Sequence, residues 1–367
     1  WRATRRMRRR RQAVVALALG AGTSVVGLAL SATTTTTTPE RRRFVIVGDC
    51  HRQYSDDDNA ALAAMGADLA LFVGDFGNED AETVATVARC ATEKCSIFGN
   101  HDFWHTSQPW RGHHPTTWYR SRGAARLAGL DERPTFRSPT LEALHETLDD
   151  CDVGFRRRAA LCDGLFDVVG ARPFSRGGDG IYKSKFYKHH YQKVRSVDDA
   201  ADRIVHHCDS ATLPYVLLAH NGPAGLGSRP TDICGKDWGV PPLGGDWGDR
   251  DLSQALRRVS KPPLFLAFGH MHSPLRDGRP RTMLSFFPTG RDNGDRIMCV
   301  NAAVFPRWRN DTGTGDVARH FTVVDVARNS FDGGDWGVVA VSCEWRLPSG
   351  ECLERTVDYE APPPAPR

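Results

Sequence analysis

The stretch that decides the fold is Phe44-Val45-Ile46-Val47-Gly48-Asp49-Cys50-His51. Four apolar residues are followed at once by a glycine and then by polar side chains. A short apolar run of this kind predicts a buried strand. Gly48 allows a sharp turn where the strand ends, which would carry Asp49 and His51 over the edge of a sheet.

The same arrangement of an apolar run followed by a polar block occurs four more times. The runs lie at 69–73, 95–98, 214–219 and 264–268, and the blocks that follow them are Gly74-Asp75, Gly99-Asn100-His101-Asp102, His220-Asn221 and Gly269-His270-Met271-His272. In an open α/β sheet the carboxyl ends of neighbouring strands lie side by side. We therefore expect the five blocks to meet at one crevice.

Between these runs lie segments with helical periodicity, which is typical of an α/β protein. Further strands are predicted at 165–170, 297–304 and 320–326, and helices near 55–65, 79–91, 140–149, 196–207 and 251–259. Residues 44–346 are expected to form one domain. Within it, 103–139 has the scattered aromatic, proline and arginine residues of an insertion loop, and 347–367 is expected to be an extended, proline-rich tail.

Residues 1–43 have the composition of a targeting or low-complexity leader that is removed or disordered. They contain an arginine cluster, an uncharged stretch at 13–32 and six consecutive threonines. An arginine-rich, acid-poor leader favours an organelle transit peptide, whereas 13–32 also resembles a signal sequence or a marginal membrane anchor. We favour removal, so no stable membrane span is expected after processing.

The charge of the chain is concentrated in this leader. Ten Arg and one Glu give residues 1–43 a net charge of +9, whereas the whole chain carries +4, so residues 44–367 carry −5. A duplex nucleic-acid binder usually has a clustered basic face. The acidic body therefore argues against duplex nucleic acid as a partner and makes a nuclease less plausible.

The ten cysteines are too sparse for a disulfide framework, and none falls in a CxxC pair. A structural zinc site of the ribbon or finger type is therefore not expected. The cysteines are instead expected to be buried or free thiols in a reducing compartment.

The residue types in the five blocks suit a metal centre. His, Asp and Asn offer a mixed nitrogen and oxygen set that fits zinc, iron or manganese. A pair of metals about 3.5–4 Å apart needs a bridging carboxylate and about three further ligands for each ion. Seven residues meet that count: Asp49, His51, Asp75, Asn100, His220, His270 and His272.

The order D-x-H, GD, GNHD, a single strand-end His and GHxH resembles the calcineurin-like metallophosphoesterase superfamily. The resemblance implies a four-layer α/β/β/α sandwich of two mixed sheets. It assigns Asp49, His51 and His272 to one divalent ion (Mn, Fe or Zn). It assigns Asn100, His220 and His270 to a second ion, with Asp75 bridging both.

The resemblance also implies the reaction, a hydrolysis of a phosphomonoester or phosphodiester by a hydroxide that two metals activate. His101 occupies the position of the family's general acid or transition-state stabiliser, and Asp102 is expected to orient it. The alternative is a catalytically weak, metal-bearing scaffold that binds partners, because relatives can keep a fold while losing its chemistry.

The segments His220 to Gly227, Asp232 to Trp238 and Asn301 to Arg307 resemble an uncharacterised plant and cyanobacterial branch, which implies a chloroplast location. Secretion or anchoring through 13–32 is the alternative. At the third position after the bridging Asp stands Asn78, where purple acid phosphatases have a tyrosine ligand. The candidates for contacts with a small phosphoester substrate are Arg52, Asn221 and Lys236.

Overall fold

Two sheets pack face to face, and the alternation of side chains along the strands explains how. The computed structural model describes residues 40–107, 138–191, 194–241, 243–291, 294–328 and 334–362. In β1 (Arg41–Val47), Phe44 and Ile46 point between the sheets, while Val45 and Val47 belong to the core on the helix side. Both faces of the strand are buried from Phe44 to Val47, which is why this part of its sequence is continuously apolar.

The first sheet is seven-stranded and mixed, with the order β13-β12-β11-β1-β2-β3 and with β10 paired to β11. β1, β2 and β3 run parallel, whereas β11, β12 and β13 continue the sheet antiparallel. The other strands are β2 (Leu69–Phe72), β3 (Lys94–Ser96), β10 (Trp308–Asn310), β11 (Val317–Arg328), β12 (Trp336–Arg346) and β13 (Cys352–Glu360).

The second sheet has six strands in the order β4-β5-β6-β7-β9-β8. Its four central strands are parallel, and β4 and β8 pair antiparallel at its two edges. The strands are β4 (Arg157–Ala160), β5 (Phe166–Gly170), β6 (Tyr215–Leu218), β7 (Leu266–Phe268), β8 (Leu284–Pro288) and β9 (Arg296–Asn301). The rings of Phe44 and Phe166 meet edge to face at 5.1 Å, which joins the two sheets.

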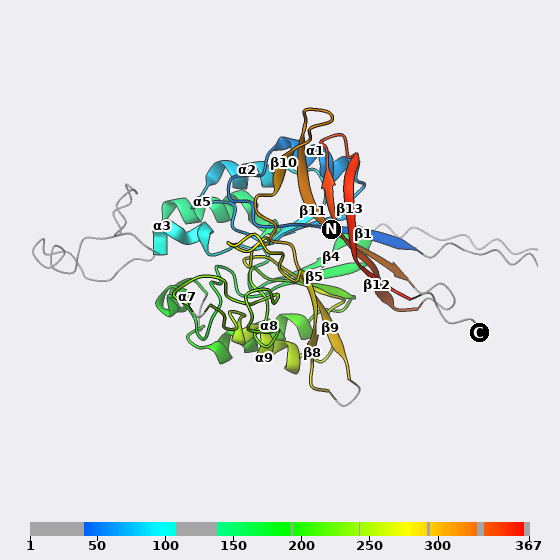
Figure 1. Cartoon of the computed structure of the whole chain (residues 1–367). Helices are drawn as coiled ribbons and strands as arrows, with labels where there is room; N and C mark the ends of the chain where they lie inside the picture. Colours follow the sequence, from blue (N-terminus) through cyan, green and yellow to red (C-terminus); the bar gives the residue numbers. More distant parts are fainter. Residues whose placement is uncertain are drawn as a thin grey trace, which may run out of the picture. The chain divides into compact units, whose positions relative to one another are not determined.

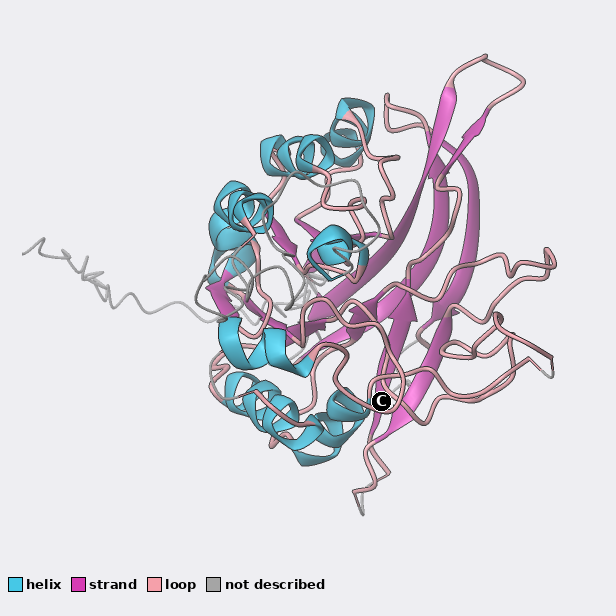
Figure 2. Cartoon of the chain, turned by 90° about the vertical axis from the view of Figure 1, so that its left-hand side faces the viewer, coloured by secondary structure: helices cyan, strands magenta, loops and turns pink. Residues whose placement is uncertain are grey.

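Helices cover the outer faces of the sheets. Figure 1 shows α1, α2 and α5 on one side of the strands and α8 and α9 on the other, and Figure 2 shows the long curved strands beside the helices. The helices are α1 (Asp56–Ala64), α2 (Ala81–Arg89), α3 (Trp104–Ser107), α5 (Pro139–Leu148), α6 (Leu161–Gly164), α7 (Ser184–His190), α8 (Val197–Asp209) and α9 (Arg250–Arg258), with 3-10 turns η1 (His101–Phe103) and η3 (Asp149–Cys151). The predicted α/β architecture of two mixed sheets is confirmed. Within the described ranges, no helix has the length and apolar character needed to cross a bilayer.

Several helices begin where the sequence places a capping residue. Ser196 caps α8 by accepting the N–H of Asp199, whose carboxylate accepts the N–H of Ser196 in return. Asp80 caps α2 by accepting the N–H of Glu82 at 3.3 Å. These side chains satisfy backbone donors that have no partner inside the helix.

The C-terminal region differs from the extended tail expected at 347–367. Cys352–Glu360 forms β13, which pairs antiparallel with β12. β13 is largely exposed and its side chains are mostly polar, so it lacks the apolar periodicity that reveals a strand in sequence. Residues 363–367 lie outside the described part of the chain.

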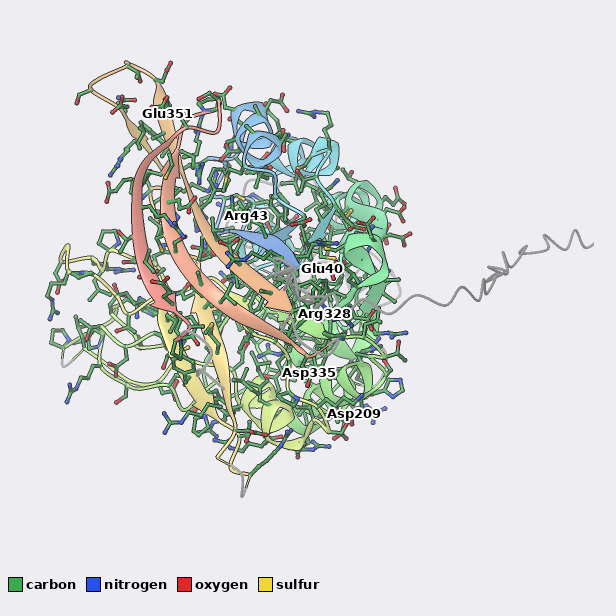
Figure 3. All side chains as sticks on the ribbon, turned by 90° about the vertical axis from the view of Figure 1, so that its right-hand side faces the viewer. Glu40, Arg43, Asp209, Arg328, Asp335 and Glu351 are labelled. Carbon is green, nitrogen blue, oxygen red and sulfur yellow. The ribbon has the colours of Figure 1, made fainter. Side chains whose placement is uncertain are left out.

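Two other expected boundaries also shift. The first strand begins at Arg41, before the expected domain start at 44, and the ladder of β1 with β11 extends to this end. Figure 3 shows Glu40, Arg43 and Arg328 here, where Glu40 and Arg328 lie 3.9 Å apart. The expected insertion loop at 103–139 begins with the end of η1 and with α3, and its residues 108–137 lie outside the described residues.

A buried ion pair ties the segment before β10 to the start of α1. The guanidinium of Arg307 contacts the carboxylate of Asp58, and both side chains are almost completely buried. Arg307 also donates to the carbonyl of His320 at 3.1 Å. Because removal of one member leaves the other charge buried without a partner, such a pair is costly to break.

We expect Arg307→Met to lower the free energy of unfolding by about 3–5 kcal/mol, because the buried Asp58 carboxylate loses its closest cation and the remaining one, Arg319, lies 3.8 Å away. Urea unfolding followed by circular dichroism measures the loss. Arg309→Met is the matched control: the pair of Arg309 with Glu354 is exposed, so its loss should cost about 0–1 kcal/mol. Adding Asp58→Asn to Arg307→Met should recover part of the stability, and no recovery would contradict this explanation.

Candidate active site

All five polar blocks lie at the carboxyl ends of parallel strands. Asp49 and His51 follow β1, Asp75 follows β2, and Asn100 and His101 follow β3 in the first sheet. In the second sheet, His220 follows β6, and His270 and His272 follow β7. The structure brings all seven predicted ligand residues together at the junction of the two sheets.

The first group of side chains consists of Asp49, His51 and His272. Their candidate ligand atoms lie within 4.8 Å of one another. The Nε2 atom of His272 is 2.9 Å from Oδ2 of Asp49 and 3.1 Å from Nε2 of His51. Two imidazole nitrogens and a carboxylate oxygen therefore converge on one point.

The second group consists of Asp75, His220 and His270, again within 4.8 Å. Nε2 of His220 lies 3.4 Å from Oδ1 of Asp75 and 3.1 Å from Oδ1 of Asn100. Nε2 of His270 is buried and has no hydrogen-bond partner among the described residues. A buried polar atom without a partner is costly, so a ligand for this nitrogen is expected.

Asp75 connects the two groups. Its Oδ1 faces His220 in the second group, while its Oδ2 lies 3.8 Å from Nε2 of His51 in the first. The N–H of His101 also donates to Oδ1 at 2.7 Å. One carboxylate therefore presents a different oxygen to each group.

Contacts outside the groups fix how the imidazoles point. Nδ1 of His220 donates to the carbonyl of Val73 at 2.7 Å, which leaves Nε2 as the nitrogen with a lone pair. This kind of bond sets the tautomer of a metal-binding histidine. The amide of Asn301 donates to the carbonyl of Met271 at 2.7 Å and so holds the loop between His270 and His272.

Burial and charge favour the protonation states that bind cations at four of these side chains, whereas at His272 burial is outweighed by the hydrogen bond with Asp49, which raises the pKa of the ring. Burial, together with the neighbouring His220, lowers the pKa of His270 to about 3, and burial also lowers the pKa of His51 against the pull of the nearby carboxylates. Burial raises the carboxyl pKa of Asp49 and Asp75, but the surrounding imidazoles outweigh it and hold both pKa values below the usual range. Neutral imidazoles and ionised carboxylates are the forms that bind metal.

The backbone around the two groups is strained, and it is packed so closely that two of its glycines cannot be replaced by residues with a side chain. Asp75, His51 and His270 all have a positive φ, at 51°, 41° and 66°. Residues held in this region cost energy and cluster at functional sites. A Cβ on Gly99 would lie 2.3 Å from Oδ1 of Asp75, and one on Gly269 would lie 2.1 Å from Oδ1 of Asp49, so only glycine fits at either position.

The expected role of Asp102 needs correction. Its carboxylate is fully buried and accepts the backbone N–H groups of Asp75, Phe76 and Gly99 at 2.9, 2.8 and 2.7 Å. Burial and the Asp75 charge raise the pKa of Asp102, and the three N–H donors oppose that rise. Asp102 therefore positions the turn that carries Asp75. The Nδ1 atom of His101 is held instead by Oδ1 of Asn78, at 2.7 Å.

A cavity of about 430 Å³ opens beside the two groups, a size typical of small-molecule sites. Its walls are lined by Asn100, His101, His270 and His272 and by seven residues that sequence reasoning missed as site residues: Arg176, Asp237, Trp238, Trp247, Pro274, Arg276 and Phe305. Arg176 follows β5, a predicted strand whose carboxyl end lies beside β6. The loop directly after that strand, from Ala171 to Arg176, contains arginines and no His or Asn, so its positive charge is the feature that marks it in the sequence.

The three expected substrate-contact residues do not line this cavity. Arg52 is 71% exposed and pairs with Asp80 at 2.9 Å. Asn221 is buried and donates to the carbonyl of Trp247 at 2.9 Å. Nζ of Lys236 lies 4.8 Å from the centre of the Trp247 ring. Arg176 and Arg276 replace Arg52 and Lys236 as the cations that line the cavity.

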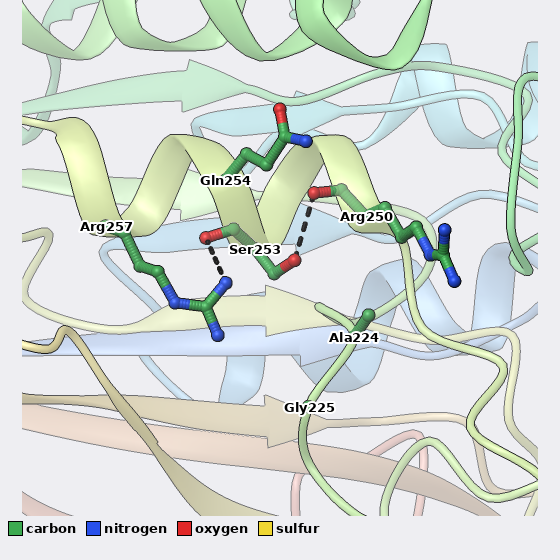
Figure 4. A pocket seen from close by; sticks show the side chains of 6 residues that line it. All are labelled: Ala224, Gly225, Arg250, Ser253, Gln254 and Arg257. Atoms are coloured by element: carbon green, nitrogen blue, oxygen red, sulfur yellow. Dashed lines mark hydrogen bonds between the residues drawn. The ribbon is translucent and has the colours of Figure 1, made fainter.

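A second pocket of about 290 Å³ lies on α9 and shares no lining residue with the first. Figure 4 shows Ser253 bonded to the carbonyl of Arg250, and Arg257 bonded to the carbonyl of Ser253. The guanidinium of Arg250 is paired with Asp179, and that of Arg257 lies 5.0 Å from the centre of the Phe287 ring. Its cations are engaged, so this pocket has less to offer an anion.

The sheets and the gathered His, Asp and Asn side chains define a class, the metal-dependent phosphoesterases. The chain belongs to the calcineurin-like phosphoesterase family, whose sequence model matches residues 42–274. Among curated protein sequences, none matches the chain significantly.

Solved structures resemble the chain only distantly. The protein TT1561 of Thermus thermophilus is 11% identical, with a TM-score of 0.39, and the match covers 78% of this chain and 94% of that one. The purple acid phosphatase PPD1 of yellow lupin is 11% identical, with a TM-score of 0.33 and coverage of 87% and 54%. A metallophosphoesterase of Sphaerobacter thermophilus is 14% identical, with a TM-score of 0.27 and coverage of 83% and 89%. Such weak similarity bears on no detail of the site.

We expect Asp102→Asn to destabilise the metal-free protein by about 1–3 kcal/mol, because an amide NH₂ would face backbone N–H donors that now meet a carboxylate. Urea unfolding in the presence of a chelator measures this loss. The matched control is Asp277→Asn, since Asp277 is exposed and its partner in the described part of the chain is the nearby Arg279. Equal midpoints for Asp102→Asn and the wild type would contradict the positioning role.

Proposed function

We propose that the chain hydrolyses a phosphomonoester or phosphodiester with the help of two divalent cations, Mn, Fe or Zn. Asp49, His51 and His272 would hold one cation. Asn100, His220 and His270 would hold the other, with Asp75 between them. The observation that carries the proposal is that the two carboxylate oxygens of Asp75 face different groups. Oδ1 lies 3.4 Å from Nε2 of His220, and Oδ2 lies 3.8 Å from Nε2 of His51.

The donor set fits such ions on its own chemistry. The buried Nε2 of His270 lacks a partner among the described residues, and Gly99 and Gly269 leave space where any side chain would intrude. When bound, the cations would lower the pKa of water to give a nucleophile near neutral pH and would neutralise the phosphoryl oxygens. The remaining chemistry falls to the side chains around the cavity.

His101 is placed to handle the leaving group. It lines the cavity, and its Nδ1–H donates a hydrogen bond to Oδ1 of Asn78. Nε2 is therefore the ring nitrogen that remains free to contact the substrate. In the protonated ring, Nε2–H donates to the leaving oxygen as the bond to phosphorus breaks. Asn78 therefore takes the orienting role that the sequence suggested for Asp102.

Arg176 and Arg276 would bind the substrate's phosphoryl oxygens. Both line the cavity and both side chains are exposed. Among the described residues, neither guanidinium pairs with a carboxylate, but that of Arg176 lies 4.8 Å from the centre of the Tyr182 ring, so Arg276 is the more available of the two. Charge-assisted bonds from arginine to phosphate are among the stronger hydrogen bonds in proteins.

We expect Asp75→Asn to lower turnover of a chromogenic phosphoester by more than about 100-fold, because a ligand change should exceed the 10- to 100-fold effect of outer residues. Metal content, measured by plasma emission spectroscopy, should fall in the same variant. The isosteric amide still accepts the N–H of His101, so the fold should persist by circular dichroism.

Asp277→Asn serves again as the matched control and should keep both metal and turnover. Retained turnover in Asp75→Asn would exclude the shared role of this carboxylate. A metal-loaded wild type that cleaves no member of a broad phosphoester panel would instead favour the scaffold alternative.

We expect Arg276→Ala to lower kcat/KM by about 10- to 100-fold, because the loss of hydrogen bonds to a charged group weakens binding by about this factor. Steady-state kinetics on the same substrate measures it, with metal content unchanged because Arg276 lies outside both groups. Arg279→Ala is the control, since Arg279 pairs with Asp277 and does not line the cavity. Equal losses in both variants would mean that general surface charge is responsible.

The finer assignments remain predictions. Membership of the plant and cyanobacterial branch rests on the motifs from His220 to Arg307. The chloroplast location rests on that branch and on the leader, which lies outside the described residues. Import of the full-length chain into isolated chloroplasts would test the location.

A further inference from the structure

Two tryptophans form the wall of the cavity that lies beyond the histidine and aspartate groups. Trp238 and Trp247 both line it and both are partly exposed. Their ring centres are 5.5 Å apart and the planes are nearly perpendicular, at 82°. The ring of Trp238 also meets the ring of His270 at 6.4 Å, so the aromatic wall adjoins the second group directly.

Trp247 is held rigidly. Its Nε1–H donates to the carbonyl of Arg176 at 2.7 Å, and its backbone N–H donates to the carbonyl of Cys234 at 2.9 Å. Gly177 lies against the ring so closely that an added Cβ would be 2.6 Å from its Cδ1 atom. A rigid aromatic surface loses little entropy when a ligand stacks on it.

A buried charged cluster anchors the two loops that carry these contacts. Arg172 bonds to Asp249 at 2.7 Å and to Asp251 at 2.8 Å, and Ser175 donates to Asp249 at 2.6 Å. Burial, despite Arg172, raises the pKa of Asp249 to about 6. The cluster ties the loop with Arg176 to the segment that follows Trp247.

Cations surround the aromatic wall. Nζ of Lys236 lies 4.8 Å from the ring centre of Trp247 and 6.0 Å from that of Trp238. Arg176 and Arg276 line the same cavity. A site with aromatic faces, available cations and catalytic groups at one end matches a ligand that is planar at one end and anionic at the other.

We propose that the substrate carries a planar aromatic group, of the size of a nucleoside base, that stacks on Trp238 and meets the nearly perpendicular ring of Trp247 edge to face, while its phosphoester reaches the histidine and aspartate groups. This inference rests on the proposed function. Sequence-independent stacking on aromatic side chains is a common way to bind bases. Phosphate esters of simple sugars or of serine offer no such surface and should be poor substrates.

Adenosine 5′-monophosphate and ribose 5-phosphate test the proposal, because both release phosphate from the same kind of primary alcohol and differ in the base. We expect kcat/KM to be at least about tenfold higher for adenosine 5′-monophosphate, within the range that stacking provides. Trp238→Leu should bring the two values close together by lowering only the first. Trp238 makes no side-chain hydrogen bond in the described structure, so this change leaves the polar contacts in place.

Trp308→Leu is the matched control, since Trp308 is 40% exposed on β10 and does not line the cavity. It should leave both values unchanged. Equal kcat/KM for the two substrates in the wild type, or an unchanged ratio in Trp238→Leu, would overturn the inference while leaving the proposed function intact.

Binding without turnover separates the two proposals. If neither ester is cleaved, the broad phosphoester panel decides the proposed function, and calorimetric titration with adenosine and with ribose decides the fate of the aromatic subsite. Adenosine binding that Trp238→Leu weakens about tenfold would support the subsite. No detectable adenosine binding would overturn it.

Discussion

The structure of the site depends on one buried carboxylate that binds three backbone N–H groups. Asp102 reaches from the turn after β3 to the turn after β2, where it accepts the N–H groups of Asp75 and Phe76, and it also accepts that of Gly99. These bonds hold Asp75 in a left-handed backbone conformation that it would not otherwise favour. Because Asp75 serves both groups of side chains, the geometry of each group depends on this anchor.

The strands that carry the site could be predicted because each one is a short apolar run that can be recognised from its own residues. The five polar blocks follow apolar runs, and parallel strands bring their carboxyl ends to one edge whatever the intervening sequence. The convergence of His51, His220 and His272 therefore follows from strand order. β13 could not be found in this way, because an exposed edge strand is held by its backbone ladder and leaves no apolar pattern.

Side-chain partners were harder to predict than side-chain positions. Asp102 is next to His101 in the sequence, but its carboxylate points away from the His101 ring because it accepts three backbone N–H groups. Asn78, 23 positions earlier, became the partner of His101 because the turn after β2 folds over η1. Likewise Arg176 and Trp247 join the cavity through a buried cluster that carries no local signature.

The polar character of β13 bears on how the protein behaves at high concentration. The edge strand of a sheet presents unpaired N–H and C=O groups to other chains, and an edge that is long and apolar promotes association into larger aggregates. The outermost strand here carries Glu354, Arg355 and Asp358, and Arg355 lies 3.2 Å from Glu344 on β12. A second copy of the sheet would have to remove these charged side chains from water to extend the ladder, so the charged edge of β13 disfavours growth of the sheet from this side.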